Sequence, residues 1–238
     1  MALLYEKRSA ADIYQVRSAG ASVRLYSNGV LHSQYNPRQP VAGNIWDLLL
    51  LPAFMQAPPA KILLLGLGGG SLIHLIRAFF PHAHITCVEI DPVHIDIAQR
   101  YFKIPQHGVQ IIQGDAYAFL RRNRRRFDWI MDDVFSHVSG EPERPQKIEP
   151  LIAHYLKALA ANGVLSFNLI GRQHLQPLLK PFFRQGIGLR HPLYDNRILS
   201  FLRQRVSTPV FHQRLQQYAA LDQRRKTCRL QFKQYSLF

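Results

Sequence analysis

Two patterns of hydrophobic and polar positions occupy the first sixty residues. Residues 22–35 alternate apolar and polar side chains on either side of Asn28-Gly29, a dipeptide that tolerates the positive φ angles of a tight hairpin turn. Residues 41–56 have the spacing of an amphipathic helix, and Pro58-Pro59 ends it. The start of the chain is therefore predicted to be a small β-hairpin followed by a helix.

From residue 61 onward, short apolar runs alternate with segments of helical spacing. Runs of this length and composition are typical of strands that are buried on both faces. Predicted strands cover residues 61–65, 84–89, 109–112, 127–131 and 164–168, with a closing antiparallel pair at 189–193 and 198–203. Predicted helices run from the glycine loop to residue 80 and over 92–101, 117–122, 146–160 and 175–185. This alternation predicts an α/β fold with a mostly parallel seven-stranded sheet and right-handed crossovers.

Length and composition indicate one domain with appendages. The 238 residues are 47% hydrophobic and 19% charged, so the chain can bury a large core, and overall disorder is excluded. We divide it into a β-hairpin and helix extension (1–57), a Rossmann-like domain (58–206) and a basic C-terminal tail (207–238).

Cysteine usage and hydropathy bear on the compartment. Cys87 and Cys228 are too few and too far apart for a disulfide framework or a zinc site. The longest apolar stretch, residues 45–55, is too short to cross a bilayer and contains Asp47 and Pro52. No secretory signal is evident at the N-terminus. We expect a cytoplasmic protein that holds no metal and does not enter the membrane.

The glycine loop 66–70 follows one predicted strand and opens a helix. Its glycines Gly66, Gly68 and Gly70 allow a tight turn and a close approach of ligand to backbone, and the helix N-terminus offers free N–H groups. Glu89 ends the next strand, 23 residues after Gly66, and can accept hydrogen bonds from both ribose hydroxyls. The loop and the acid predict a nucleotide or nucleoside site.

The acidic residues at the ends of the later strands favour a cofactor other than NAD. Asp115, with Ala116 beside it, follows the third strand and can accept from an adenine amino group, while Asp132-Asp133 end the fourth. Carboxyl ends of parallel strands meet at one crevice, so these positions surround one ligand. The set favours S-adenosylmethionine. Capping of a helix by Asp115, or of a loop by Asp133, is the purely structural alternative.

The chain resembles the spermidine synthase-like branch of the class I S-adenosylmethionine-dependent methyltransferase superfamily over about residues 22–203. The matching stretches are Asn28 to His32, Leu51 to Ala53, Val88 to Pro92, Gly114 to Ala116 and Phe127 to Asp132. The resemblance implies the Rossmann-like class I methyltransferase fold, a transferase activity, and S-adenosylmethionine or its decarboxylated form as cofactor.

Departures from the aminopropyltransferase pattern distinguish two kinds of relative. Those enzymes usually carry an aspartate in the glycine loop where Gly69 stands, a second aspartate after strand four where Phe135 stands, and a hairpin glutamine where His32 stands. A polyamine cation needs acids to bind it and a base to activate it. The glycine loop and the Phe167-Asn168-Leu169-Ile170 strand resemble the methyltransferase-like members instead, some of which methylate lysine on an elongation factor.

The resemblance also implies roles for individual residues. The cofactor-binding set is Gly66, Gly68, Gly70, Glu89, Asp115, Ala116 and Asp132, with the glycines under the methionine part and Asp132 near the amino group and sulfonium. Asp132 and Asp133 are the expected catalytic residues, and Asp133 orients or deprotonates an incoming amine. His32 and Gln34 are expected to bind the acceptor, which is a small amine, a protein or an RNA.

Three functions stay open: a methyltransferase, a polyamine aminopropyltransferase that uses decarboxylated S-adenosylmethionine, and a non-catalytic nucleoside-binding protein. The net charge of +15 and the basic runs 121–126 and 224–233 predict weak polyanion binding, against the alternative of a solvated basic surface. Apolar residues exposed on the N-terminal hairpin and helix would suit a homodimer.

Overall fold

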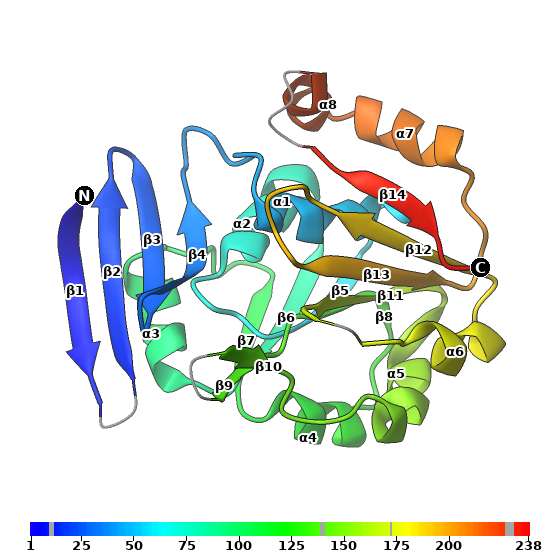
Figure 1. Cartoon of the computed structure of the whole chain (residues 1–238), viewed down its shortest axis with the longest axis horizontal. Coiled ribbons are helices and arrows are strands. Elements are labelled where there is room, and N and C mark those ends of the chain that lie inside the picture. The colour runs from blue at the N-terminus through cyan, green and yellow to red at the C-terminus, as the bar shows by residue number, and fades with distance from the viewer. Residues whose placement is uncertain (10–11, 139–140, 172, 227–230) are drawn as a thin grey trace.

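Two sheets organise the chain (Figure 1), a four-stranded antiparallel sheet at the N-terminus and an eight-stranded mixed sheet. The computed structural model describes residues 1–9, 12–138, 141–171, 173–226 and 231–238. Of the predicted basic run at 224–233, residues 227–230, including Cys228, lie outside the described residues.

The N-terminal sheet is larger than the predicted hairpin. Its strands are β1 (Ala2–Arg8), β2 (Ile13–Ala19), β3 (Ser22–Ser27) and β4 (Val30–Tyr35), paired in that order. The β3–β4 hairpin turns at Asn28 and Gly29 with φ of 51° and 82°, as the dipeptide predicts. The prediction missed both β1 and β2. β1 is an edge strand with both faces largely open, so its sequence does not alternate.

The central sheet confirms the predicted Rossmann-like α/β fold. Its order is β14-β12-β13-β11-β8-β5-β6-β7. The parallel strands are β5 (Lys61–Leu65), β6 (His84–Glu89), β7 (Val109–Gln113), β8 (Phe127–Asp132) and β11 (Leu159–Leu169). β13 (Arg197–Leu202), β12 (Gln185–Arg190) and β14 (Lys233–Ser236) are antiparallel. The eighth strand, β14, comes from the segment predicted as a tail, which is therefore built into the sheet.

Helices cover both faces of the central sheet (Figure 1). They are α1 (Ile45–Leu50), η1 (Leu51–Met55), α2 (Ser71–Phe79), α3 (Pro92–Arg100), α4 (Ala116–Arg122), η2 (Glu149–Leu151), α5 (Ile152–Ala158), α6 (Gln176–Leu179), η3 (Lys180–Phe182), α7 (Thr208–Gln216) and α8 (Ala219–Lys226). A short hairpin of β9 (Ser136–Val138) and β10 (Glu141–Glu143) follows β8. Within the described residues, no helix combines the length and the apolar character needed to span a membrane.

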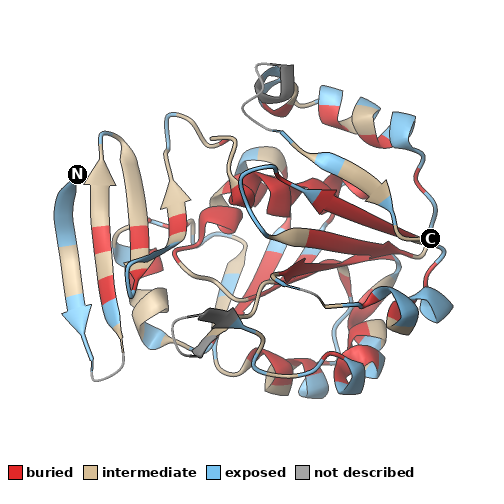
Figure 2. Cartoon of the chain, viewed as in Figure 1, coloured by how far each residue is buried: buried red, intermediate tan, exposed pale blue. Residues whose placement is uncertain are grey.

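Two hydrophobic cores lie on opposite faces of the central sheet, whose strands are largely buried (Figure 2). Along β5, Ile62 and Leu64 join the core with α1, α2 and α3, whereas Leu63 and Leu65 join the core with α4 and α5. This alternation explains why β5 is an unbroken apolar run. All residues of α1 and η1 are buried, so the expectation that the first helix exposes an apolar surface is wrong.

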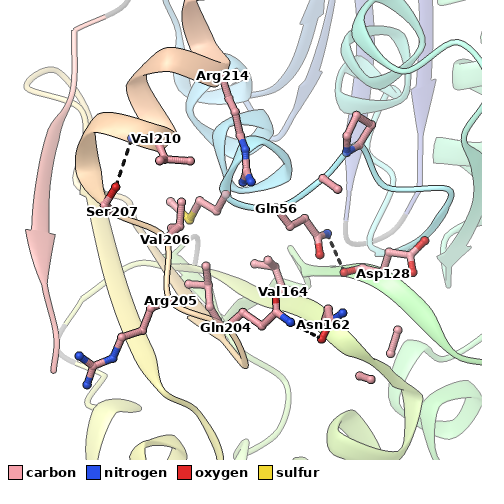
Figure 3. Close-up of a pocket in the computed structure, with 16 residues that line it drawn as sticks. Gln56, Asp128, Asn162, Val164, Gln204, Arg205, Val206, Ser207, Val210 and Arg214 are labelled. Atoms are coloured by element: carbon pink, nitrogen blue, oxygen red, sulfur yellow. Dashed lines mark hydrogen bonds between the residues drawn. The ribbon is translucent and has the colours of Figure 1, made fainter.

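The carboxyl ends and the amino ends of the parallel strands border different surface features. The carboxyl ends of β5 to β8 hold the glycine loop and the predicted acids. The amino ends border an open cleft of about 850 Å³ between η1, the start of β8 and the β13–α7 connection (Figure 3).

Candidate functional site

The glycine loop between β5 and α2 needs its glycines. Gly66, Gly68 and Gly70 have φ of 96°, 54° and 85°, a region that residues with a side chain rarely adopt. A Cβ on Gly66 would lie 2.5 Å from the carbonyl oxygen of Asp133. The loop therefore runs against the backbone that follows β8, and the structure brings Asp133 beside it.

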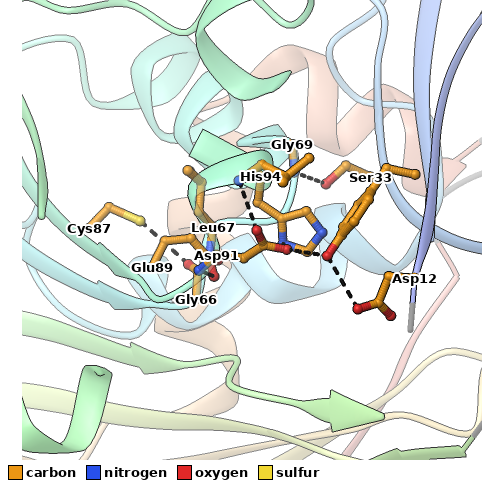
Figure 4. Close-up of polar contacts among 11 residues, drawn as sticks. Asp12, Ser33, Gly66, Leu67, Gly69, Cys87, Glu89, Asp91 and His94 are labelled. Atoms are coloured by element: carbon orange, nitrogen blue, oxygen red, sulfur yellow. Dashed lines mark hydrogen bonds and ion pairs between the residues drawn. The ribbon is translucent and has the colours of Figure 1, made fainter. Parts of the chain in front are cut away.

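The N-terminal sheet is fixed onto this loop through β4 (Figure 4). The Gly69 N–H donates to Ser33 Oγ at 2.7 Å. The Ser71 hydroxyl donates to the Gln34 carbonyl at 2.9 Å, and the Gln34 N–H donates back to Ser71 Oγ at 3.0 Å. These bonds hold both predicted acceptor-binding residues, His32 and Gln34, on the strand next to the loop.

Gly69 has no space for a side chain. A Cβ on this residue would lie 2.6 Å from the ring of Phe102 and 2.8 Å from the Cβ of Ser33. Both neighbours are buried, Phe102 at 2% exposure and Ser33 at 1%, so neither can move aside into solvent. The position is closed to the aspartate that aminopropyltransferases usually carry there.

Glu89 is oriented by backbone donors. Its Oε2 accepts from the Leu67 N–H and its Oε1 from the Asp91 N–H, each at 2.9 Å (Figure 4). Each oxygen keeps a further lone pair, so the carboxylate can still accept from a diol. The neighbouring Ile90 is 64% exposed and adds an apolar surface at the same strand end. This donor and acceptor set fits the ribose of a nucleoside.

A cluster that the sequence did not reveal links Glu89 to the N-terminal sheet. His94 Nδ1 lies 4.0 Å from Glu89 Oε2 and 3.8 Å from Asp91 Oδ2. The Tyr14 hydroxyl donates to Asp91 Oδ2 at 2.8 Å, and burial followed by this bond raises the pKa of Tyr14. The His32 ring lies 5.8 Å from the His94 ring, which puts His32 at the Glu89 side of the site.

Asp115 caps a helix. Its Oδ1 accepts from the Ala118 N–H at 2.5 Å and it is the N-cap of α4, whose first residue is the buried Ala116. A Cβ on the preceding Gly114 would meet no atom within 4 Å, so open space adjoins this turn. Asp115 therefore has the helix-capping role that was its purely structural alternative, and this role leaves the turn accessible to a ligand.

The adjacent acids Asp132 and Asp133 have opposite environments. Asp132 is fully buried, pairs with Arg144 at 2.7 Å, and accepts from the hydroxyl of Tyr155 and from the Val134 N–H. Its carboxylate faces the interior and offers no surface to a cofactor. The sequence analysis expected Asp132 near the cofactor amino group, whereas in this structure its carboxylate is buried against Arg144 and Tyr155.

Asp133 is the half-buried acid at the loop. Its N–H donates to the Leu65 carbonyl at 2.9 Å, and its Oδ1 accepts from Asn168 Nδ2 at 2.7 Å. Burial raises the pKa of Asp133 to about 7; the Asn168 bond and Arg144 oppose the rise, while Asp132 and Glu89 add to it. A carboxylate with this pKa exchanges protons near neutral pH, as a general base must.

Arg144 is a central residue that the sequence analysis missed. Its guanidinium donates to Asp132 Oδ1 at 2.7 Å, to the Asn168 carbonyl at 2.6 Å and to the Tyr117 hydroxyl at 3.2 Å. The side chain is only 3% exposed. A buried cation thus lies between the carboxyl ends of β8 and β11. Arg144 carries no motif, and only the folded chain brings it there from beyond β10.

The fold is that of a Rossmann-like domain of the class I methyltransferase type, and the geometry at its strand ends fits a nucleoside. The family model of the spermine/spermidine synthase domain matches residues 47–176, more than half of the chain. The chain therefore belongs to the spermine/spermidine synthase domain family, which confirms the resemblance seen in the sequence.

The sequence relatives are of two kinds. A polyamine aminopropyltransferase of Vibrio vulnificus is 36% identical over 136 residues, which cover 55% of this chain and 44% of that protein. An eEF1A lysine and N-terminal methyltransferase homolog of Drosophila melanogaster is 32% identical over 119 residues, covering 47% of this chain and 18% of that protein. The alignments thus span less than half of either relative.

Solved structures divide in the same way. Human methyltransferase-like protein 13, solved in complex with SAH, is 27% identical with a TM-score of 0.61, covering 75% of this chain and 88% of that one. A probable spermidine synthase of Corynebacterium glutamicum has a TM-score of 0.73 at 20% identity, covering 90% and 88%. At 20% identity the latter likeness shows the fold alone.

Proposed function

We propose that the protein is an S-adenosylmethionine-dependent methyltransferase of the spermidine synthase-like family. The observation that carries the proposal is the closed space at Gly69, where Phe102 and Ser33 exclude the acidic side chain expected of an aminopropyltransferase. The relatives named as eEF1A methyltransferases, and the 27% identity to methyltransferase-like protein 13, support the same choice.

The residues at the strand ends fit this cofactor. Glu89 would hold the ribose hydroxyls, and Asp115 with Ala116 would border the adenine. The loop glycines Gly66, Gly68 and Gly70 would lie under the methionine part. When bound, S-adenosylmethionine supplies a methyl group on an activated sulfonium, so the protein's contribution is mainly proximity and in-line orientation.

Asp133 is the proposed proton acceptor for an acceptor nitrogen. Its pKa of about 7 leaves a large fraction of the carboxylate ionised at neutral pH, and Asn168 holds one of its oxygens in place. We assign Asp132 a positioning role through Arg144, in place of the catalytic and cofactor-binding role expected from the sequence.

The acceptor is a nitrogen of a small amine, a protein or an RNA, and we propose that His32 and Gln34 contribute to its pocket from β4. The buried pair of Arg144 and Asp132 opposes a polyamine, because the Asp132 carboxylate is neutralised within the pair and is not available to a cationic substrate. We further propose a cytoplasmic protein with weak polyanion binding, and a homodimer formed through the exposed Val30 and Leu31 of the hairpin.

A polyamine aminopropyltransferase that uses decarboxylated S-adenosylmethionine is the second candidate. The 36% identity to the Vibrio vulnificus enzyme favours it. A non-catalytic nucleoside-binding protein is the third, and any turnover would exclude it.

A transfer assay separates the candidates. The purified protein is incubated with methyl-labelled S-adenosylmethionine and with the small-molecule, protein and RNA fractions of a cell extract. We expect label in one fraction with the wild type and at least tenfold less with Asp133→Asn. Formation of methylthioadenosine from decarboxylated S-adenosylmethionine and a polyamine, with no methyl label transferred, would overturn the proposal.

A further inference from the structure

The amino-terminal edge of the central sheet, opposite the cofactor edge, is strongly basic. Three exposed arginines, Arg124, Arg125 and Arg126, come directly before β8. The strand register sets Lys61 beside both the start of β8 and His84 of β6. Further cations at this edge are Lys157 before β11 and, after β13, Arg203 and Arg205.

This charge is not neutralised within the described chain. The acid at the start of β8, Asp128, already accepts from the backbone N–H groups of Ala60 and Lys61 at 2.9 and 2.8 Å. Arg125 donates to the neutral amide of Gln110. Among the described residues, Arg124 and Arg126 have no hydrogen bond or ion pair, so their guanidinium groups are available to an anionic partner.

The cleft of about 850 Å³ adjoins this basic row, because Asp128, two residues after Arg126, lines its wall (Figure 3). Three amide side chains face it. Gln56 Nε2 donates to the Asp128 carbonyl at 2.7 Å, and Gln204 Nε2 donates to Asn162 Oδ1 at 2.8 Å. The side-chain carbonyl oxygens of Gln56 and Gln204 and the NH₂ group of Asn162 therefore stay available to a ligand.

We propose that this edge binds single-stranded nucleic acid, with phosphates along the basic row and an unpaired base in the cleft. The row from β13 to β6 crosses four strand spacings of about 4.8 Å, or roughly 19 Å, which suits several consecutive phosphates. Guanidinium groups bind phosphate in a bidentate manner, and amides hydrogen-bond base edges. An acidic peptide would use the cations but not the amide-lined cleft, and a paired base would not reach it.

The surface lies at the opposite ends of the strands from the glycine loop. A bound strand would therefore leave the cofactor site open, and the inference does not depend on methyl transfer. It specifies a position and a partner class for the polyanion binding that the net charge of +15 suggests.

The test is fluorescence anisotropy with labelled 15-nucleotide RNA and DNA single strands of equal sequence, measured over a series of salt concentrations. The variant Arg124→Gln/Arg125→Gln/Arg126→Gln is compared with a control of equal charge change at the exposed Lys7, Arg38 and Lys180. A cleft variant, Asn162→Ala/Gln204→Ala, is measured with the oligonucleotides and with heparin. Circular dichroism verifies that each variant is folded.

We expect the arginine variant to bind single strands at least tenfold more weakly, and its salt slope to fall by about 2, since each lost phosphate contact contributes about 0.7. The control should stay within about twofold. The cleft variant should lose affinity for oligonucleotides but not for heparin. Equal losses in the arginine and control variants, duplex DNA binding as tightly as single strands, or polyglutamate competing as well as RNA would each overturn the proposal.

Discussion

Removal of the Arg144 side chain tests the buried network behind the candidate site. In Arg144→Met, the Asp132 carboxylate would stay at 0% exposure without the guanidinium that now lies 2.7 Å from it. Removing one partner of a buried pair typically costs about 3–5 kcal/mol, because the remaining charge is left uncompensated. That is a large fraction of the roughly 5–15 kcal/mol by which domains are stable.

The magnitude is checked by a double-mutant cycle. Urea unfolding gives the free energy of unfolding of the wild type, Arg144→Met, Asp132→Asn and the double variant. The double variant buries no unpaired charge, so we expect it to be more stable than Arg144→Met, with a coupling energy of at least about 2 kcal/mol. If the losses of unfolding free energy in the two single variants were additive, or if Arg144→Met lost less than about 1 kcal/mol, the Asp132–Arg144 pair would not stabilise the end of β8.

Four further outcomes follow from the site. Because the pKa of Asp133 is raised to about 7, transferase activity should rise with pH through that value, and Asp133→Asn should remove this limb from the pH–rate profile. Because the pKa of Asp133 is higher in the folded state, protonated Asp133 favours folding. The stabilisation from Asp133 is therefore present below about pH 4 and is lost as the pH rises through about 7. The free energy of unfolding, measured against pH for the wild type and Asp133→Asn, tests this dependence. Gly69→Asp should lower the free energy of unfolding by about 1–3 kcal/mol, because the new side chain would overlap Phe102 and Ser33. An unchanged melting temperature would contradict the conclusion that Gly69 has no space for a side chain. Ser33→Ala should cost about 1–3 kcal/mol, since it leaves the Gly69 N–H without its acceptor, and Ser22→Ala serves as a control on the same sheet.

Much of the fold follows from hydrophobic periodicity. The strand β5 is apolar from Ile62 to Leu65 and β8 is apolar from Trp129 to Met131, and the glycine loop with Glu89 marks the carboxyl edge. Two of the missed elements lack such a pattern: β1 has both faces open, and β14 pairs with β12 from more than forty residues away. Pairing over that separation depends on the folded sheet, not on local sequence.

The two adjacent acids show the limit of sequence reasoning at the site. Successive residues at a strand end point to opposite sides, so Asp132 and Asp133 cannot both face the glycine loop. The choice between them is made by Arg144 and Tyr155, which hold Asp132 in the interior and come from beyond the end of β8. Neither residue carries a motif that would mark this role.

Cofactor selectivity tests the central claim most directly. Isothermal titration calorimetry compares S-adenosylmethionine, S-adenosylhomocysteine, decarboxylated S-adenosylmethionine, methylthioadenosine and NAD on the wild type and on Glu89→Ala. We predict that the first two bind more tightly than the other three, and that Glu89→Ala abolishes their binding. Preference for the decarboxylated cofactor or methylthioadenosine, or binding of NAD alone, would contradict the assignment of this site to methyl transfer.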